Sequence, residues 1–373
     1  MIAQLDQFWR RVTEGLEVSQ LWGQFKKDAT TSYRLYHRDY TLARRPAREN
    51  SFWEKSQGLA WAILEKLTPA RRVLLLIGVL LLLFPSGGFS YRGRSGEVQA
   101  VEFDFHFAGG AVLFVLLMLE IADRVVMKRD LEIARDIQKW LLPAVAPKVP
   151  GISVAFATRA ANTVAGYFYD VFPRQTADPT QPSYLLAVAD VAGKSIPAAL
   201  LMATFQASLR TLSSVPCTLE QLASGMNRYA CTNSQGGLRF TTAFLAEYDP
   251  TSGSLAYINA GHNPPVLRRS TTGAVEHLEA GGLPLGIQDD AVYRGAQVTL
   301  QRGDWLIIFT DGVVEAVDGR EIEFGEERMI AVVEADPGAT PDDALRRMIE
   351  AIDTFVGNTP QHDDITCVLV KAG

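Results

Sequence analysis

Residues 183–213 read SYLLAVADVAGKSIPAALLMATFQASLRTLS, in which a buried strand runs into a helix. The apolar run ends at Asp190, and the pattern after it predicts a helix over about 197–213. Two further strand-like runs, FTTAFLAEYD at 240–249 and LAYINAG at 255–261, are joined by PTSGS, which is typical of a hairpin. Strands interrupted by few helices favour an α+β layered sandwich over a doubly wound parallel sheet.

A second long helix is predicted over 341–356. Thr340 supplies its N-cap and Pro341 its first position, and acidic residues follow in the first turn. Its predicted core face consists of Leu345, Met348, Ile349, Ile352 and Phe355. The apolar strand ITCVLVKA at 365–372 follows it.

The composition excludes several classes of protein. The chain has 373 residues, of which 47% are hydrophobic and 21% are charged, so we expect neither a disordered nor a fibrous protein. The net charge of -6 provides no overall basic field, which argues against a nucleic-acid-binding protein. Cys217, Cys231 and Cys367 have no C-x-x-C spacing, so neither a disulfide scaffold nor a cysteine-ligated zinc site is expected.

Two apolar runs precede the layered region, at 73–84 and at about 103–122. The first is long enough to cross a bilayer if it extends to Phe89, and a pair of buried core helices is the alternative. Basic residues flank the two runs: Arg71, Arg72, Arg124, Lys128 and Arg129. This charge pattern predicts a two-span hairpin over 71–122, which makes the chain a multi-pass inner-membrane protein with both ends in the cytoplasm. Residues 1–70 are then expected to form a cytoplasmic helical segment.

Residues 123–148 are the predicted linker between the apolar runs and the layered region. Apolar side chains recur every seven residues from the end of the second apolar run into this linker, at Leu119, Val126, Ile133 and Trp140. This spacing predicts a short coiled coil and hence a homodimer, and an ordinary amphipathic helix packed on the next domain is the alternative. Pro143, Pro147 and Pro150 end the helix, and the layered domain is predicted over 149–373.

Acidic residues stand at the ends of several predicted strands. Asp190 and Asp311 each end an apolar run, and Asp363 and Asp364 directly precede another. Burying a lone carboxylate is unfavourable, so several together indicate a hard cation held between strand ends. Oxygen ligands without a His or Cys cluster favour Mg²⁺ or Mn²⁺ over zinc, although each of these residues alone also suits a cap or a turn.

Gly193-Lys194-Ser195 has the form of the end of a phosphate-binding loop, because it follows a buried strand and opens a helix. Such a loop needs a glycine where this chain has Val188, inside the strand. Without a glycine-rich bend the backbone cannot surround a phosphate, so a nucleoside triphosphatase is not expected.

The motifs of the layered region follow one another in a distinctive order. They are ADVAGKSIPAALLMATFQASLRTL, FTTAFLAEYDPTSGSLAYINAGHNPP, GGLPLGI, GDWLIIFTDGVVEA and QHDDIT. The first resembles the D-V-S-G-[HK]-G-x-x-A-A-L-x-M signature of SpoIIE/RsbU-type serine/threonine phosphatases, a bacterial branch of the metal-dependent protein phosphatase 2C group. The others match that family in order and spacing, and the resemblance spans about 130–372.

The resemblance implies a four-layer α-β-β-α sandwich with two Mn²⁺ or Mg²⁺ ions at one end of its sheets. It also implies that water attacks phosphoserine or phosphothreonine directly. By motif, Asp190, Asp311 and Asp363 are expected to bind metal together with the carbonyl of Val191, and Asp364 occupies a neighbouring position. The rim of the site is expected to contain Lys194, His262 and Asn263. A purely structural turn suits the last two equally well.

One position departs from the family. Its usual stretch is V-G-G-D-[FY]-Y-D, whose first Asp bridges both ions, whereas residues 164–170 read VAGYFYD and place Tyr167 there. A neutral phenol is a poor ligand for Mg²⁺ or Mn²⁺. Asp170 would face the other side of the strand unless a bulge intervenes.

Two functions therefore stay open. The first is a phosphatase whose expected substrate, from the resemblance, is a phosphorylated STAS-type anti-sigma-factor antagonist. The second is a catalytically degenerate module that binds a phosphoprotein or another subunit. A membrane and a second copy of the chain are the other expected partners, and no nucleic acid is expected.

Overall fold

A computed structural model describes residues 67–85, 87–92, 98–143, 145–161, 163–174, 183–193, 195–233, 239–279, 281–361 and 363–373, together with Leu64. The chain divides into two compact units, Met1–Val125 and Val126–Gly373. The helical segment predicted over 1–70 lies almost entirely outside the described residues.

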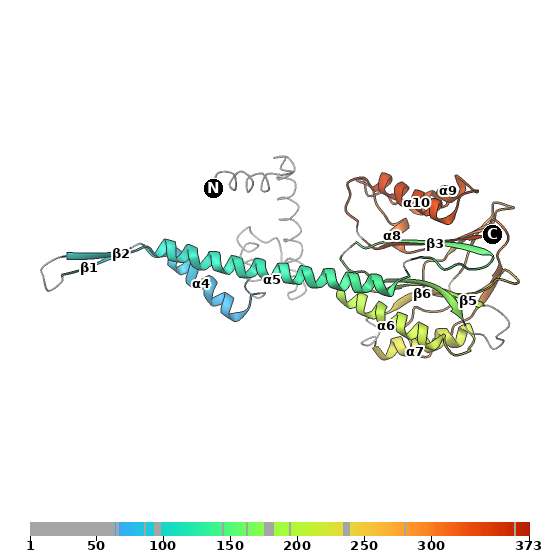
Figure 1. The fold of residues 1–373 in the computed structure, drawn as a ribbon, viewed down its shortest axis with the longest axis horizontal. Coiled ribbons are helices and arrows are strands. Elements are labelled where there is room, and N and C mark those ends of the chain that lie inside the picture. Colours follow the sequence, from blue (N-terminus) through green and yellow to red (C-terminus); the bar gives the residue numbers. More distant parts are fainter. Residues whose placement is uncertain are drawn as a thin grey trace, which may run out of the picture. The chain divides into compact units, whose positions relative to one another are not determined.

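In the part of the first unit that the structure describes, two helices are joined by a β-hairpin (Figure 1). In chain order these are α4 (Pro69–Leu83), β1 (Gly87–Arg92), β2 (Val98–Phe103) and the beginning of α5 (Phe105–Leu141). α4 packs closely on α5, because a Cβ added at Gly109 would lie 2.9 Å from the carbonyl oxygen of Gly78. Arg71 on α4 pairs with Glu120 at 3.0 Å and with Asp123 at 2.7 Å on α5.

The predicted two-span hairpin is wrong. α4 has only 15 residues, which cover about 22 Å, whereas the hydrocarbon core of a bilayer is about 30 Å thick. The helix does not extend to Phe89, because Phe84 already has an extended backbone ahead of Pro85 and the chain then enters β1. Among the described residues, only α5 is long and apolar enough to cross a membrane, with 37 residues and a mean hydropathy of 2.0 in its most apolar window.

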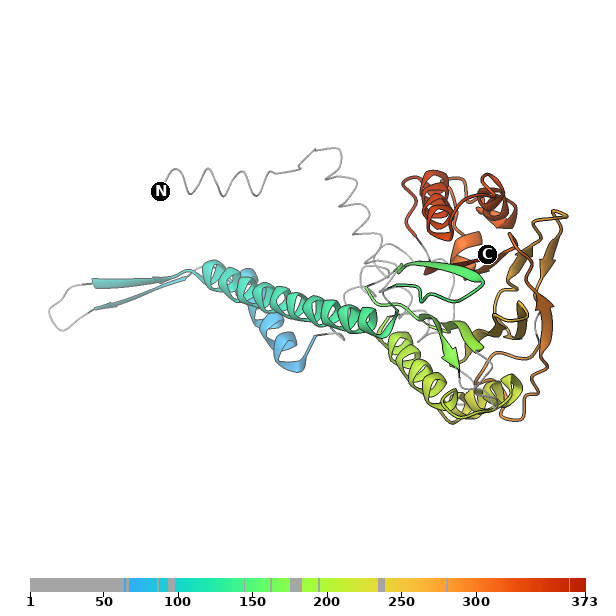
Figure 2. The same cartoon turned by 45° about the vertical axis from the view of Figure 1, so that its right-hand side comes forward.

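Two five-stranded antiparallel sheets form the centre of the second unit (Figure 2). The first sheet has the order β10-β7-β6-β5-β4. Its strands are β4 (Tyr167–Arg174), β5 (Ser183–Val191), β6 (Thr241–Asp249), β7 (Ser254–Ala260) and β10 (Ala296–Thr299). The second sheet has the order β3-β12-β11-β8-β9. Its strands are β3 (Ile152–Arg159), β8 (Val266–Arg268), β9 (Val275–His277), β11 (Trp305–Phe309) and β12 (Ile365–Ala372).

Helices cover the outer faces of both sheets. α6 (Ile196–Leu212) and α7 (Leu219–Asn233) pack on the first sheet. α8 (Asp311–Val314), α9 (Gly325–Glu334) and α10 (Pro341–Val356) lie on the side of the second sheet. One buried apolar cluster fills the space between the sheets and under α6 and α7, and another lies under α8 to α10. The predicted α+β sandwich is therefore confirmed.

Several predicted elements form as expected. The runs joined by PTSGS pair as the antiparallel strands β6 and β7. The helix predicted over 341–356 is α10, and the side chain of Thr340 accepts a hydrogen bond from the N–H of Asp343 at 3.2 Å. Helices α7 and α9 were not predicted from the sequence.

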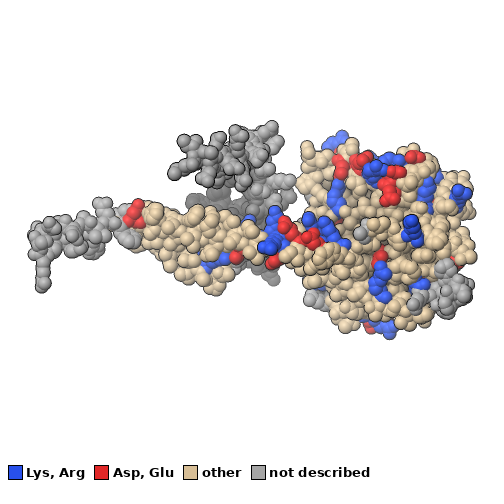
Figure 3. Space-filling model, viewed as in Figure 1, with Lys and Arg blue, Asp and Glu red and all other residues tan. Residues whose placement is uncertain are grey.

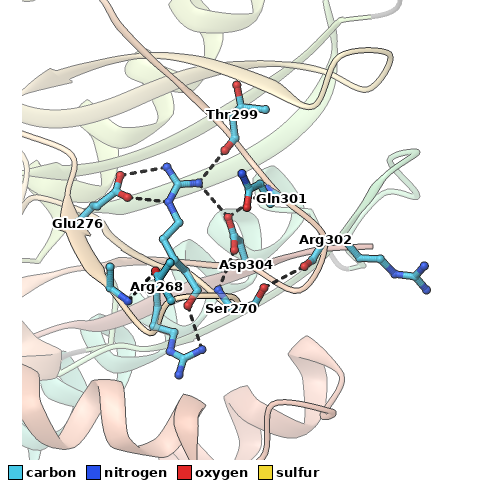
Figure 4. A network of polar contacts seen from close by, with 10 residues as sticks. Arg268, Ser270, Glu276, Thr299, Gln301, Arg302 and Asp304 are labelled. Atoms are coloured by element: carbon cyan, nitrogen blue, oxygen red, sulfur yellow. Dashed lines mark hydrogen bonds and ion pairs between the residues drawn. The ribbon is translucent and has the colours of Figure 1, made fainter.

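A buried carboxylate joins the second sheet to a neighbouring turn (Figure 4). Asp304 is 1% exposed and accepts hydrogen bonds from the N–H groups of Ser270 at 2.8 Å and Gln301 at 3.1 Å. Arg269 donates to Asp304 at 2.9 Å and to Glu276 on β9 at 2.7 Å. Burial alone would raise the pKa of Asp304, but these donors outweigh it and lower that pKa below its usual value.

Candidate functional site

A pocket of about 230 Å³ lies at one end of the two sheets. It is lined by Asp190, Val191, Ala192, Gly193, Phe240, Thr242, His262, Asn263, Thr310, Asp311, Asp363 and Asp364. We call it the acidic pocket. Antiparallel pairing places the end of β5 beside the start of β6, and the end of β11 beside the start of β12. For this reason, acidic residues far apart in the sequence meet here.

The structure brings together most of the residues predicted for the site. Those that line the acidic pocket are Asp190, Val191, His262, Asn263, Asp311 and Asp363. Tyr167 does not line it, and Lys194 lies outside the described residues. That the aspartates and the Val191 carbonyl bind metal stays a prediction.

Asp190 stands at the end of β5, after the buried residues Leu185 to Ala189. Burial raises its pKa, and the nearby charges of Asp311, Asp364 and Asp363 raise it further, to about 7. Loss of the proton from Asp190 is therefore unfavourable, because the resulting negative charge is buried and is repelled by the neighbouring carboxylates. A cation among these groups would offset both the burial and the repulsion.

Asp311 is placed by the turn from β11 into α8. Its Oδ1 accepts the N–H of the next residue, Gly312, at 2.7 Å. A Cβ added at Gly312 would lie 2.3 Å from the carbonyl oxygen of Asp364, so only glycine fits at this position. The Asp-Gly pair of the FTDG stretch thus brings the ends of β11 and β12 together.

Asp364 holds the backbone that leads into β4. Its Oδ1 accepts the N–H of Ala161 at 2.8 Å, and its Oδ2 accepts the N–H of Gly166 at 3.2 Å. The preceding Asp363 accepts the N–H of Asp364 at 2.9 Å. Asp364 is therefore engaged with the loop before β4, while Asp363 lines the acidic pocket together with Asp311.

His262 forms part of the pocket wall and is 4% exposed. The backbone N–H of His262 donates to Oδ1 of Asn259 at 2.7 Å, and the ring Nδ1 lies 3.2 Å from the hydroxyl of Thr242. Burial lowers the pKa of His262 to about 4, so the imidazole is neutral at physiological pH. Its Nε2 makes no hydrogen bond within the described part of the chain.

Tyr167 lies inside the sandwich, between the two sheets. It pairs across the first sheet with Asp190, and its ring stacks on that of Tyr169 with centroids 6.5 Å apart. The ring of Tyr169 in turn packs on that of Phe156 in the second sheet, with ring centroids 4.4 Å apart. Burial raises the pKa of Tyr167 despite a hydrogen bond with Thr158, so the phenol is neutral. No carboxylate is available at this position.

Asp170 cannot replace the missing carboxylate. Pairing between β4 and β5 is continuous from Tyr167 opposite Asp190 to Arg174 opposite Ser183, so no bulge turns Asp170 toward the pocket. Asp170 is 2% exposed and accepts hydrogen bonds from Arg210 of α6 at 2.6 and 2.9 Å. The interpretation that Asp170 serves the site through a bulge is therefore wrong.

Two threonines of the pocket, Thr242 and Thr310, were not predicted from the sequence. Thr310 donates to the carbonyl of Asp364 at 2.9 Å, and Thr242 contacts His262. Both are polar residues at the ends of apolar strands, directly beside a motif residue, and this position was the available signal. Their hydroxyls hold pocket residues in place.

The donor set suits a hard divalent cation. Every acidic group of the pocket is a carboxylate, and carboxylate oxygens are the ligands that Mg²⁺ and Mn²⁺ prefer. The raised pKa of Asp190 indicates the same need for positive charge. Across the described ranges, however, no group of three or more His, Cys, Asp or Glu residues is arranged closely enough to hold a metal ion.

Comparison with known proteins gives the family. The model of Stage II sporulation protein E (SpoIIE) matches residues 180–373, which is more than half of the chain. The chain belongs to the SpoIIE family.

Among curated relatives, the phosphoserine phosphatase RsbU of Bacillus subtilis (strain 168) is 30% identical over 189 residues, or 51% of this chain and 54% of RsbU. The phosphoserine phosphatase RsbP of the same strain is 26% identical over 202 residues, or 50% of this chain and 46% of RsbP. The chain thus spans about half the length of the curated relatives it matches.

A solved structure supports the same fold. The SiaA-PP2C domain of Pseudomonas aeruginosa has a TM-score of 0.55 and is 22% identical, covering 68% of this chain and 99% of that domain. At this identity the likeness establishes a PP2C-like fold. Metal ions are present in two more distant structures, RsbX with magnesium (TM-score 0.46) and PstP with 2 manganese ions (TM-score 0.44).

Proposed function

We propose that this chain is a metal-dependent protein phosphatase that removes phosphate from phosphoserine or phosphothreonine. The observation that carries the proposal is the convergence of Asp190, Asp311 and Asp363 on one pocket, where burial, and then the charges of neighbouring carboxylates, raise the pKa of Asp190 to about 7. Membership of a family with phosphoserine phosphatases supports it further. As the resemblance of its motifs implies, the proposed substrate is a phosphorylated STAS-type anti-sigma-factor antagonist.

In this proposal Asp190, Asp311, Asp363 and the Val191 carbonyl hold Mn²⁺ or Mg²⁺, which supplies a water of lowered pKa and neutralises phosphate charge. The strand ends bring these residues to one pocket, and in this proposal the bound cation draws their oxygens together. His262 stays neutral beside them and adds no positive charge that would repel a cation.

The test is release of phosphate from a phosphoserine peptide by the full chain in detergent. Hydrolysis is expected with Mn²⁺ or Mg²⁺ and not with excess chelator. Asp311→Asn should lower turnover at least about 100-fold, because even groups that only support a metal ligand are worth about 10–100-fold. The exposed Asp342→Asn is the matched control and should leave turnover unchanged. Full turnover in chelator would refute the proposal.

The second candidate function is a phosphoprotein-binding module without catalysis. Tyr167 favours it, because a buried neutral phenol stands where the family has its bridging carboxylate. Such a module would bind the phosphopeptide in the presence of Mn²⁺ without hydrolysing it. Binding and hydrolysis measured on one preparation separate the two candidates.

We also propose that α5 attaches the chain to the inner membrane. Few charged residues cover the first part of α5, and charged residues gather where this apolar stretch ends (Figure 3). The residues that follow the stretch include Arg124, Lys128 and Arg129. By the positive-inside rule, these basic residues favour a cytoplasmic position for the second unit.

A further inference from the structure

A second pocket, with a volume of about 140 Å³, lies beside the acidic pocket. We call it the flanking pocket. Residues from α8, from the end of α10, from the end of β3 and from the start of β12 line it, and they include Arg159, Glu315, Val317, Val356, Pro360 and Ile365. Its volume is several times the roughly 30 Å³ that one water molecule occupies in the liquid, so it has room for one side chain of a bound partner.

The flanking pocket and the acidic pocket share a wall. Asp363 lines both of them, and Gly312 of the flanking pocket directly follows Asp311 of the acidic pocket. Glu315 stands at the end of α8, where its N–H donates to the carbonyl of Asp311 at 2.8 Å. One helical turn, about 5.4 Å along the axis, therefore separates Asp311 from Glu315. A substrate whose phosphoserine lies in the acidic pocket can place a neighbouring residue in the flanking pocket.

The charges around the flanking pocket favour a positively charged group. The charged groups that act on Glu315 are all negative: Asp311, Glu323 and Asp363. Arg159 also lines the pocket, but it pairs with Asp353 of α10, so its charge is already balanced. In the proposed function Asp311 and Asp363 hold a divalent cation. Glu315 is then the carboxylate that is left for a positive group of the substrate.

The wall of the flanking pocket suits a long side chain better than a hydrated ion. Apolar side chains form much of it: Val317, Val356, Pro360 and Ile365. Gln361 fixes the backbone of this wall, because its Nε2 donates to the carbonyl of Arg159 at 2.8 Å and to that of Asp363 at 2.7 Å. The alkyl stem of a lysine or arginine packs on apolar groups while its charged end stays in contact with water. A hydrated Mg²⁺ or Mn²⁺ gains nothing from such a wall, because hard cations bind oxygen ligands.

We propose that the flanking pocket binds a lysine or arginine side chain of the phosphoprotein substrate. Glu315 pairs with the charged end of this side chain, and the apolar wall covers its stem. An extended chain advances about 3.3–3.6 Å per residue, so the basic residue lies within about three residues of the phosphoserine. The inference rests on the proposed function, because it names a residue that determines specificity for the same substrate.

The experiment uses the full chain in detergent with Mn²⁺ and a set of phosphoserine peptides. The parent peptide has alanine at the three positions on each side of the phosphoserine, and each other peptide has one lysine at one of these positions. The readouts are kcat/KM for phosphate release and the dissociation constant of each peptide. Lysine or arginine at one position, or at two adjacent ones, is expected to raise kcat/KM about fivefold over alanine, as a partly exposed ion pair allows. Diaminopropionate, which has the charge without the long stem, should give a smaller gain there.

Substitutions of Glu315 test which residue makes the selection. Glu315→Gln should remove the difference between the lysine and alanine peptides, and Glu315→Lys should reverse the preference in favour of a glutamate peptide. Glu323→Gln is the matched control and should keep the lysine preference, because Glu323 acts on Glu315 without lining the pocket. Thermal unfolding of each variant monitors general destabilisation.

Equal kcat/KM for all peptides would overturn the inference and leave the proposed function standing. An equal gain from lysine at every position would also overturn it, because this result would indicate only a general attraction to an acidic surface. So would a Glu315→Gln variant that binds Mn²⁺ more weakly and keeps the lysine preference, because Glu315 would then serve a metal ion.

Failure of the proposed function is separately visible. A wild-type chain that binds the peptides and hydrolyses none of them disproves catalysis, and the dissociation constants of the lysine and alanine peptides then decide the inference. The same ratio, about fivefold, is expected for these constants. A chain that neither binds nor hydrolyses any peptide of the set overturns both.

Discussion

Tyr167 and Asp170 lie three residues apart on β4 and face opposite sides of the first sheet. Tyr167 stands opposite Asp190 and stacks inside the sandwich, whereas Asp170 binds Arg210 of α6. Residues directly opposite each other on antiparallel strands have side chains on the same face. Position 167 is therefore the point on β4 from which a carboxylate would meet Asp190.

Tyr167→Asp is expected to create a cation-dependent fold. Without metal, the buried carboxylate beside Asp190 and the lost ring should lower the free energy of unfolding by about 3–5 kcal/mol. Mn²⁺ should restore much of this, because a ligand that binds only the folded state stabilises it. Mn²⁺ affinity and hydrolysis of a phosphoserine peptide should also rise above the wild-type values.

Tyr169→Asp is the matched control for this prediction. Tyr169 faces the same side of β4 but pairs with Val188, away from the acidic pocket. The Tyr169→Asp variant should also have a lower free energy of unfolding, and Mn²⁺ should not restore it. Thermal unfolding of both variants with and without Mn²⁺ makes the comparison, and equal behaviour of the two would contradict the assigned position of the bridge.

Asp304 should stabilise the fold in a pH-dependent way. Its pKa is lowered in the folded state, so its contribution is present above the unfolded pKa of about 3.9 and is lost as the pH falls through the folded value. Asp304→Asn should cost about 1–3 kcal/mol at neutral pH, and the difference from wild type should shrink below about pH 4. Urea unfolding from neutral pH to about pH 3 measures this. A difference that does not vary with pH would contradict the role of the ionised carboxylate.

At the scale of elements, α5 presents an exposed apolar seam. Leu119, Val126, Ile133 and Trp140 are 41%, 59%, 50% and 81% exposed. If this seam pairs in a homodimer, the double variant Val126→Gln, Ile133→Gln should raise the dissociation constant at least about tenfold, a loss of about 1.4 kcal/mol. Sedimentation of the full chain in detergent measures this dissociation constant. Met127→Gln, which is 60% exposed but off the seam, is the control. A wild-type chain that is monomeric at all concentrations would contradict the prediction.

Helix ends and turns whose residues lie within a few positions of one another could be predicted from the sequence. Thr340 and Pro341 fixed the start of α10, and the PTSGS turn fixed the β6–β7 hairpin. The end of α4 was missed, because hydropathy alone favoured continuing the apolar run to Phe89. Pro85 and the pairing of β1 with β2, two features of the chain after the run, end the helix there.

The site was predictable only in part, for a physical reason. Strand-end aspartates are visible in the sequence because burial of the preceding run marks where each strand ends. The partners of Asp170 and Ala165 are not visible, since Arg210 is 40 residues away and Gln138 is 27 residues away. Such contacts depend on which helix covers which face of the sheet, and no pattern within one strand contains that information.

At the scale of the whole molecule, membrane attachment through α5 makes a direct prediction. Phe114→Arg with Leu117→Arg should release the chain from membranes, since each Arg costs about 2.5–3.5 kcal/mol at the centre of a span. Both residues are exposed on α5, at 61% and 54%. The measurement is the fraction of full-length chain that stays in the pellet after an alkaline carbonate wash.

The control for membrane attachment replaces equally exposed residues beyond the apolar stretch. Val125→Arg with Met127→Arg changes residues that are 62% and 60% exposed, and it should leave the chain in the pellet. A wild-type chain that is fully released by the wash would show that α5 does not span the bilayer.

The opposite orientations of Tyr167 and Asp170 also bear on how such a protein changes over generations. The codons for Tyr and Asp differ in a single base, and position 167 faces away from the contact that anchors α6 to β4. A mutation there therefore changes the residue opposite Asp190 without removing Asp170, which accepts the hydrogen bonds of Arg210. On this strand, the residue that faces Asp190 and the residue that anchors α6 can change independently, so the pocket can diverge between descendants while the scaffold is inherited intact.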